Sequence, residues 1–167
     1  VIPPTFQRLR SAGEEMERFH AGFAVIEVDY KMGYIDSAGN VVIPPRFAWA
    51  HEFTEGLAAA TTDYLHDKWG YINRSGEWAI PPEFDSASPF SEGLARVSRD
   101  GMCVYIDRNG TEVLRPDSGG ATDCAVVAGD FSNGLARWKV DDQYGYIDKK
   151  GGLVISPAFD LTFGFSE

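Results

Sequence analysis

The chain has 167 residues, of which 15 are Lys or Arg and 25 are Asp or Glu, which gives a formal net charge of −10. A surface this acidic repels phosphate backbones and anionic lipids, and no apolar run reaches the roughly 20 residues that a bilayer-spanning helix needs. We therefore expect neither a nucleic-acid partner nor membrane insertion. The 44% of apolar and 13% of aromatic residues predict a folded protein rather than a disordered one.

Residues 1–21 are predicted to form a partial repeat. They contain Ile2-Pro3-Pro4, a triplet that returns twice later in the chain, and then a long connection. In this connection Ser11 and Glu14 have the spacing of a helix-capping box, so we expect a short helix that ends at Phe19. The acidic residues of this segment are candidates for a partner-binding surface, namely Glu14, Glu15 and Glu17.

Four full repeats follow, and each contains the same three elements. A Gly-Leu-Ala triplet, which is Gly-Phe-Ala in the first copy, precedes a Tyr-Ile pair, and Ile or Leu follows nine residues after the tyrosine. The repeated tyrosines are Tyr34, Tyr71, Tyr105 and Tyr146. We predict one repeat domain over 1–167 with repeat one at 22–55, repeat two at 56–92, repeat three at 93–133 and repeat four at 134–167.

Each repeat is predicted to fold as three short antiparallel strands. In repeat three the first strand is Leu94–Ser98, and Asp100-Gly101 has the residues of a two-residue hairpin turn with positive φ angles. The second strand covers Met102–Asp107 and leads into a glycine-containing turn. The third strand is clearest at residues 77–80 of repeat two. It is expected to end at Pro81-Pro82, because proline cannot donate to a sheet.

Two further patterns recur in the connections and turns. Phenylalanines six residues apart are expected to fill the space between successive repeats, and they are Phe47 and Phe53, Phe84 and Phe90, and Phe159 and Phe165. An Asp or Asn follows each Tyr-Ile pair, at Asp36, Asn73, Asp107 and Asp148. Since a glycine turn comes directly afterwards, the side chains of this second set are expected to accept hydrogen bonds from the turn rather than to form a carboxylate site.

The segments Lys68–Asn73, Ile80–Asp85 and Phe90–Ala95 closely resemble the signature of the WG beta-repeat (KWG) family, and the likeness recurs through the whole chain. The resemblance implies a bacterial all-β repeat protein whose motif residues are structural, so no catalytic residues carry over. The structural residues in the clearest copy are Trp69, Gly70 and Tyr71. The signature tryptophan is replaced elsewhere, by Met32, Cys103 and Tyr144, and the signature glycine is Val104 in repeat three.

The predicted fold is all-β, with tandem three-stranded antiparallel β-repeats stacked in an open array. The alternative is a closed, propeller-like ring with one repeat per blade. The steps between the repeated tyrosines are unequal, at 37, 34 and 41 residues, which favours the open array.

Repeat three carries a longer connection and both cysteines. The loop Asp117–Asp123 is acidic and contains two glycines, so Asp117 and Asp123 are further candidates for partner binding. Cys103 and Cys124 fit two interpretations, as buried free thiols or as a disulfide that compensates for the missing tryptophan.

The sequence contains no phosphate-binding loop, no nucleophile elbow, and no His or Cys spacing typical of zinc. We therefore expect no enzymatic activity, no metal and no cofactor. The leading prediction is a non-catalytic protein-binding module whose acidic surface engages a basic partner, as an immunity- or adaptor-type protein would. The alternative is a carbohydrate-binding module of the bacterial envelope. Protein binding predicts buried repeat aromatics and exposed acidic loops, whereas sugar binding predicts aligned, exposed rings.

Overall fold

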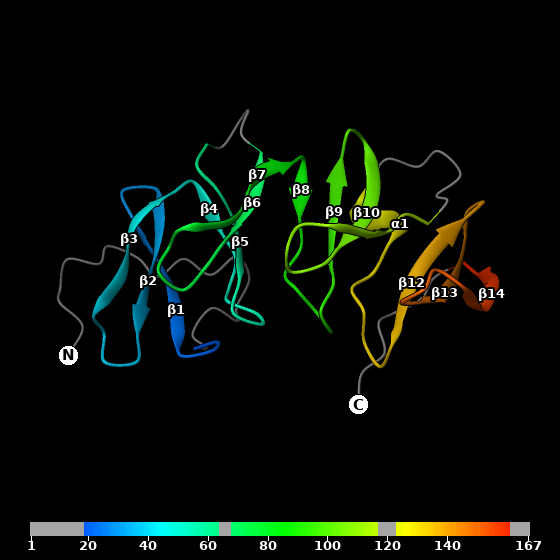
Figure 1. Cartoon of the computed structure of the whole chain (residues 1–167), viewed down its shortest axis with the longest axis horizontal. Helices are drawn as coiled ribbons and strands as arrows, with labels where there is room; N and C mark the ends of the chain where they lie inside the picture. The colour runs from blue at the N-terminus through cyan, green and yellow to red at the C-terminus, as the bar shows by residue number, and fades with distance from the viewer. Residues whose placement is uncertain (1–18, 64–67, 117–122, 161–167) are drawn as a thin grey trace. The chain divides into compact units, whose positions relative to one another are not determined.

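The computed structural model describes residues 19–63, 68–116 and 123–160 and has an all-β fold (Figure 1). The chain divides into two compact halves, Val1–Pro82 and Glu83–Glu167. Each half contains two small antiparallel sheets, and none of the sheets in the described residues closes on itself. The prediction of tandem three-stranded antiparallel repeats in an open array is therefore confirmed. The boundaries of the single predicted repeat domain stay a prediction.

The first half contains repeats one and two. Repeat one forms a three-stranded sheet of β1 (Phe23–Val28), β2 (Lys31–Asp36) and β3 (Val41–Phe47). The next sheet has the order β4 (Trp49–Ala50), β5 (Ala58–Thr61), β6 (Trp69–Ile72) and β7 (Trp78–Phe84). The short strand β4 belongs to the connection between the repeats, so the connection itself adds a strand to the second sheet.

The second half has a similar plan. One sheet has the order β8 (Ser86–Ala87), β9 (Ala95–Arg99), β10 (Met102–Ile106) and β11 (Glu112–Leu114). The other consists of β12 (Leu135–Val140), β13 (Gln143–Asp148) and β14 (Leu153–Phe159). The only helix among the described residues is the single turn α1 (Cys124–Val127), which the sequence did not predict. Residues 11–18 of the helix that we did predict lie outside the described residues.

Aspartates form the tight turns between the first and second strands. Asp100 and Gly101 both have positive φ, at 52° and 72°, which confirms the predicted two-residue turn. Asp29 and Asp141 begin the equivalent turns of repeats one and four, with φ of 49° and 47°. Aspartate is among the few residues other than glycine that accept this backbone conformation at little cost, which explains why it recurs there.

The prediction that Pro81-Pro82 ends the third strand is wrong. Strand β7 continues through both prolines to Phe84, and β3 passes through Pro44-Pro45 in the same way. The pairing of β2 with β3 explains how. Tyr34 pairs with Ile43 and Met32 pairs with Phe47, so the register shifts at the two prolines. A bulge on an outer strand leaves its prolines without any need to donate a hydrogen bond.

The signature glycine packs against this bulge. A Cβ atom built on Gly70 would lie 2.6 Å from the carbonyl oxygen of Ile80 and 2.8 Å from the nitrogen of Pro82, and Gly33 and Gly145 have the same surroundings. Only a residue without a side chain lets the two backbones come this close. Repeat three supports the same explanation. Val104 replaces the glycine there, and the third strand, β11, ends at Leu114 instead of continuing through a proline bulge.

The repeated tyrosines occupy equivalent buried positions, as predicted. Their exposed fractions are 0% for Tyr34, 0% for Tyr71, 1% for Tyr105 and 9% for Tyr146. The Tyr34 hydroxyl donates to the carbonyl of His51 at 2.6 Å, and Tyr105 donates to Gly129 at 2.6 Å. Desolvation raises the pKa of both tyrosines, so they stay protonated and keep donating. Each bond ties a sheet to the connection that follows it.

The phenylalanines of the connections also pack as predicted, with one exception. Phe53 lies between Tyr34 and Phe23, with ring centroids at 4.8 and 5.1 Å, and Phe131 packs on Tyr105 at 5.0 Å. The predicted pairs at 47 and 53 and at 84 and 90 are buried. The prediction fails for Phe159, which ends the outer strand β14 and is 44% exposed. Residue 165 lies outside the described residues.

Candidate functional site

The signature positions do not form a row of exposed rings in the described residues. Met32 and Cys103 are buried, and Trp69 and Tyr144 are half-buried. The Trp69 ring packs against His51, with centroids 5.4 Å apart. The aligned, exposed aromatics that a sugar-stacking surface requires are therefore missing at the position where the sequence suggested them.

The polar residue after each Tyr-Ile pair organises the turn, as predicted. Asp36 accepts hydrogen bonds from the amides of Ala38 and Asn40, both at 2.9 Å. Asn73, Asp107 and Asp148 each accept two backbone amides at the corresponding spacing. These four side chains therefore stabilise the turns. The neutral side chain of Asn73 accepts the same pair of hydrogen bonds as the aspartates, so these bonds do not require a charge.

The same hydrogen bonds perturb the three carboxyls. The side-chain amide of Asn40 lowers the pKa of Asp36, and its backbone amide adds to the effect. The Gly152 amide lowers the pKa of Asp148. For Asp107 desolvation acts in the opposite direction, but hydrogen bonds from Thr111 and Asn109 outweigh it, so the pKa is again lowered. All three stay ionised near neutral pH while they hold their turns.

The candidate partner-binding residues fall into two groups. Glu14, Glu15, Glu17 and Asp117 lie outside the described residues. Asp123 is described, and its carboxylate caps α1 by accepting the Ala125 amide at 3.0 Å. This structural contact is compatible with partner binding, because the Asp123 side chain remains exposed.

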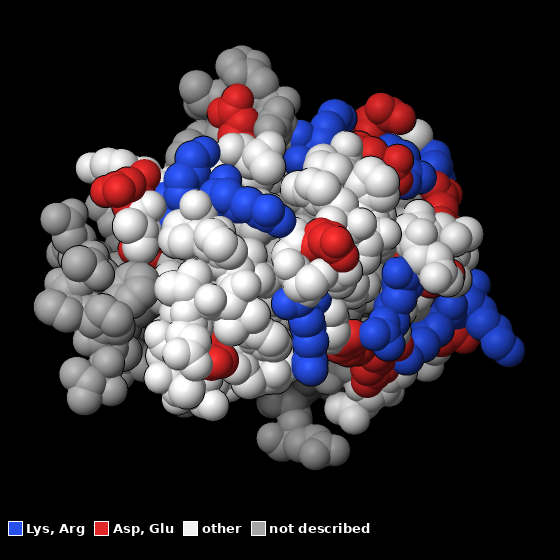
Figure 2. Space-filling view, turned by 60° about the vertical axis from the view of Figure 1, so that its left-hand side comes forward, with Lys and Arg blue, Asp and Glu red and all other residues white. Residues whose placement is uncertain are grey.

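A second acidic set was missed by sequence reasoning. Asp29, Asp100 and Asp141, which we call the hairpin-tip aspartates, are exposed at equivalent turns of repeats one, three and four. The signal was available, since an Asp stands at the same distance before each Tyr-Ile pair in these three repeats, five residues in each case. On the face that Figure 2 draws, acidic and basic side chains are interspersed, so the carboxylates there stand at discrete positions and do not form one continuous acidic surface.

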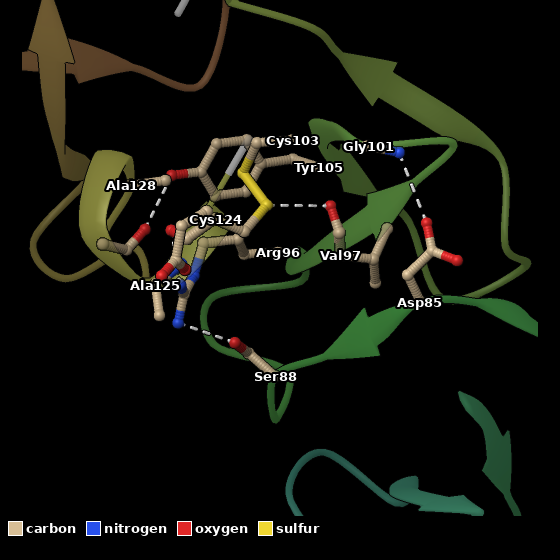
Figure 3. The surroundings of a disulfide bond; sticks show 12 residues. Asp85, Ser88, Arg96, Val97, Gly101, Cys103, Tyr105, Cys124, Ala125 and Ala128 are labelled. Carbon is tan, nitrogen blue, oxygen red and sulfur yellow. Dashed lines mark hydrogen bonds between the residues drawn. A yellow bond between two sulfur atoms is a disulfide. The ribbon is translucent and has the colours of Figure 1, made fainter. Parts of the chain in front are cut away.

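The end of the long connection in repeat three, residues 123–130, is held firmly in place. We call it the anchored insertion. Cys124 forms a disulfide with Cys103 of β10, with Cα atoms 5.1 Å apart, so the interpretation as two free thiols is wrong. Figure 3 shows Cys124 at the start of α1, with the Arg96 side chain close by. Arg96 donates to the Cys124 carbonyl at 2.7 Å, and Arg137 donates to the Ala125 carbonyl at 3.3 Å.

These two arginines are specific to the second half. Arg96 and Arg137 pair across the sheet with Tyr105 and Tyr146, and the equivalent residues of repeats one and two are Val25 and Ala59. Both arginines line a pocket of about 410 Å³, together with Asp130, which lies 3.3 Å from the Arg96 Nε atom. Because their N–H groups reach carbonyls of the anchored insertion, we assign them to holding it.

Glu92, the last residue of repeat two, contacts repeat four. It has a positive φ of 52°, an unusual conformation for glutamate, and its carboxylate accepts the Gly134 amide at 3.0 Å. The Lys149 ammonium lies 3.0 Å from the same carboxylate and also donates to the Glu92 carbonyl at 2.8 Å. The Lys149 hydrogen bond is the main cause of a lowered pKa at Glu92. The strained turn before β9 therefore positions a contact with repeat four.

Within the described ranges, no three His, Cys, Asp or Glu side chains come together in a way that could hold a metal ion. The same part of the chain has no helix with the length and apolar character needed to cross a membrane.

Short antiparallel sheets, a glycine against each proline bulge and buried tyrosines define a tandem β-repeat protein. The chain belongs to the family described as WG containing repeat, whose model matches residues 32–65, 69–103 and 144–167. The longest unmatched stretch, 104–143, begins at the replaced glycine, Val104, and includes the anchored insertion.

No curated protein matches the chain. Among solved structures, the crystal structure of Kluyvelomyces marxianus Hsv2 is similar over 79% of this chain and 46% of that chain, with 13% identity and a TM-score of 0.48. The chain thus spans less than half the length of that structure.

Proposed function

We propose that the chain is a non-catalytic, protein-binding repeat module whose exposed carboxylates engage a basic partner, as an adaptor- or immunity-type protein would. The observation that carries the proposal is that some repeated residues build the scaffold while others expose carboxylates. The signature glycines, tyrosines and turn-forming aspartates are all used to build the scaffold. The hairpin-tip aspartates instead present carboxylates to solvent at fixed positions, and the Asp123 carboxylate is exposed while it caps α1.

Electrostatics supports a basic partner. The net charge of −10 attracts cationic proteins over a distance of about 10 Å at ordinary salt, which raises the rate of association. The aspartates occupy two-residue turns joined directly to sheet strands, so little conformational entropy is lost when a partner contacts them.

The burial of the aromatics favours protein binding over carbohydrate binding. The alternative of an envelope carbohydrate-binding module needs rings in an exposed row, and the repeated tyrosines are buried. We therefore retain carbohydrate only as a competing outcome of the binding experiment.

The test compares two triple variants that remove the same charge. The tip variant carries Asp29→Asn, Asp100→Asn and Asp141→Asn, because asparagine also accepts positive φ and keeps the turn. The control carries Asp36→Asn, Asp107→Asn and Asp148→Asn, which reproduces the natural Asn73 of repeat two. Partners are captured from an extract of the source organism, purified and titrated by calorimetry.

We expect the tip variant to weaken the complex at least tenfold at low salt and the control variant to change it less than threefold. Equal weakening would mean that only net charge matters. Binding of a soluble oligosaccharide in place of a protein would overturn the proposal in favour of the carbohydrate alternative.

A further inference from the structure

The anchored insertion has weaker backbone pairing than the two equivalent connections. In two sheets, the connection between repeats adds a short strand, β4 or β8. In each of these connections, two backbone amides donate hydrogen bonds to the neighbouring strand. Ala48 and His51 donate to β5, and Asp85 and Ser88 donate to β9. In repeat four, the described residues provide one such bond to β12, from the Gly129 amide to the Arg137 carbonyl at 2.9 Å, beside an isolated bridge of Ala128 with Trp138.

In the anchored insertion, the helix α1 stands in place of a short strand such as β4 or β8, and it is too short to be stable by itself. α1 has four residues, and a helix of this length does not recover the entropy needed to form its first turn. Its stability must come from outside. Val127 and Ala128 are buried in the core cluster that contains Cys103, Tyr105 and Trp138. The side-chain hydrogen bonds of Arg96 and Arg137 add to this packing.

The disulfide is the only covalent bond between the insertion and the sheet beneath it in the described structure. Cys103 occupies the signature position that is Trp69 in repeat two, so the bond stands where that repeat has a half-buried ring packed against His51 of the preceding connection. The sulfur of Cys124 lies 3.2 Å from the Val97 carbonyl oxygen (Figure 3). In the disulfide this sulfur carries no proton, whereas a reduced thiol there could donate only a weak hydrogen bond.

We propose that Cys103–Cys124 is a redox-sensitive lock on the anchored insertion, and that reducing it releases the insertion and weakens partner binding. The second part rests on the proposed function, because Asp123 belongs to the binding surface and to the insertion. The oxidised chain presents Asp123 at the start of a fixed α1, and the reduced chain does not.

A dithiol reductant supplies the two electrons that opening the bond consumes. One thiolate of the dithiol attacks a sulfur of the bond and forms a mixed disulfide, while the other cysteine leaves as a thiolate and takes up a proton. The second thiol of the reagent then closes its own disulfide and releases the remaining cysteine as a thiol. Cys103 and Cys124 are 2% and 5% exposed, so the insertion must open before a reductant can attack. We therefore expect slow reduction in the folded state.

Amide hydrogen exchange tests the lock directly. The oxidised chain is compared with the chain after dithiothreitol treatment, with complete reduction verified by two titratable thiols per chain. We expect the Val127, Ala128 and Gly129 amides to exchange at least tenfold faster after reduction. The His51 amide holds the position of Gly129 in a connection without cysteines, and its exchange should change less than twofold.

The double variant Cys103→Ser with Cys124→Ser provides an independent check. It should show the exchange pattern of the reduced chain and no response to dithiothreitol. Unchanged exchange in the insertion after complete reduction would overturn the proposal. Equal protection of the insertion amides and of the amides in β9, β10, β12 and β13 in the reduced chain would also overturn it, because the insertion would then open only when the whole half unfolds.

Affinity for the captured partner in both redox states separates the two proposals. We expect at least fivefold weaker binding after reduction. Faster exchange with unchanged affinity would refute the redox control of binding and leave the protein-binding function intact. Absence of a saturable complex in either state would refute the protein-binding function itself.

Discussion

The close approach of the signature glycine to the proline bulge makes Gly70→Ala an unusually severe methyl addition. The new Cβ would lie 2.6 Å from the Ile80 oxygen, 2.8 Å from the Pro82 nitrogen and 2.9 Å from the Pro81 carbonyl carbon. Carbon normally keeps at least 3 Å from such atoms, and all three belong to backbone that cannot rotate away. Overpacking of a tight site costs about 3 kcal/mol, and at 2–4 °C per kcal/mol for a chain of this size the melting temperature should fall by roughly 6–12 °C.

Gly22→Ala is the matched control in the same half. Gly22 has a φ of +87° but nothing within 4 Å of the position of a new Cβ, so it isolates the backbone cost of the left-handed conformation. That cost is about 1–2 kcal/mol. Guanidinium denaturation of both variants, followed by circular dichroism, measures the difference. If Gly70→Ala destabilises the chain no more than Gly22→Ala does, the steric explanation of the signature glycine is refuted.

Three further predictions concern the tyrosines, the turns and the disulfide. Tyr105→Phe should cost about 1 kcal/mol in urea denaturation because the Gly129 carbonyl loses its donor, whereas Tyr30→Phe, at a residue that is 70% exposed, should cost clearly less. The lowered pKa values of Asp36, Asp107 and Asp148 mean that their contribution to stability is complete above the usual aspartate value of 3.8 and is lost as the pH falls below it through the folded-state values. The triple Asn variant should therefore lose less stability than the natural chain between pH 4 and pH 2, and an identical acid limb would contradict this. The Cys103→Ser and Cys124→Ser double variant should lose about 3 kcal/mol, the value for closing a loop of this length, and an unchanged urea midpoint would refute the contribution of the disulfide.

The repeat made much of the fold predictable. Four copies of one pattern average out the irregularities of any single copy, so the three main strands of each repeat, the turn positions and the buried tyrosines follow from spacing alone. The short strands β4 and β8, which the connections add to two of the sheets, were not predicted. The turn-forming role of Asp36 and its equivalents was predictable for a local reason, since an Asp or Asn before a glycine turn has backbone amides within reach.

The failures have identifiable causes. A proline ends a strand only where its missing N–H is needed, and the bulge at Pro81-Pro82 removes that need. The single turn α1 has four residues, too few to show a periodic pattern, and Arg96 and Arg137, which hold it, come from different repeats. The disulfide depended on distance between chain segments, which residue spacing leaves open.

The central claim is that this repeat scaffold binds a basic protein through the hairpin-tip carboxylates, which its own folding does not require. Titration of the captured partner with the tip variant and the charge-matched control variant, at 50 and 200 mM salt, tests it most directly. The account predicts that the tip variant binds at least tenfold more weakly than the control at 50 mM salt and that the gap narrows at 200 mM. Equal affinities for the two variants at both salt concentrations would contradict it.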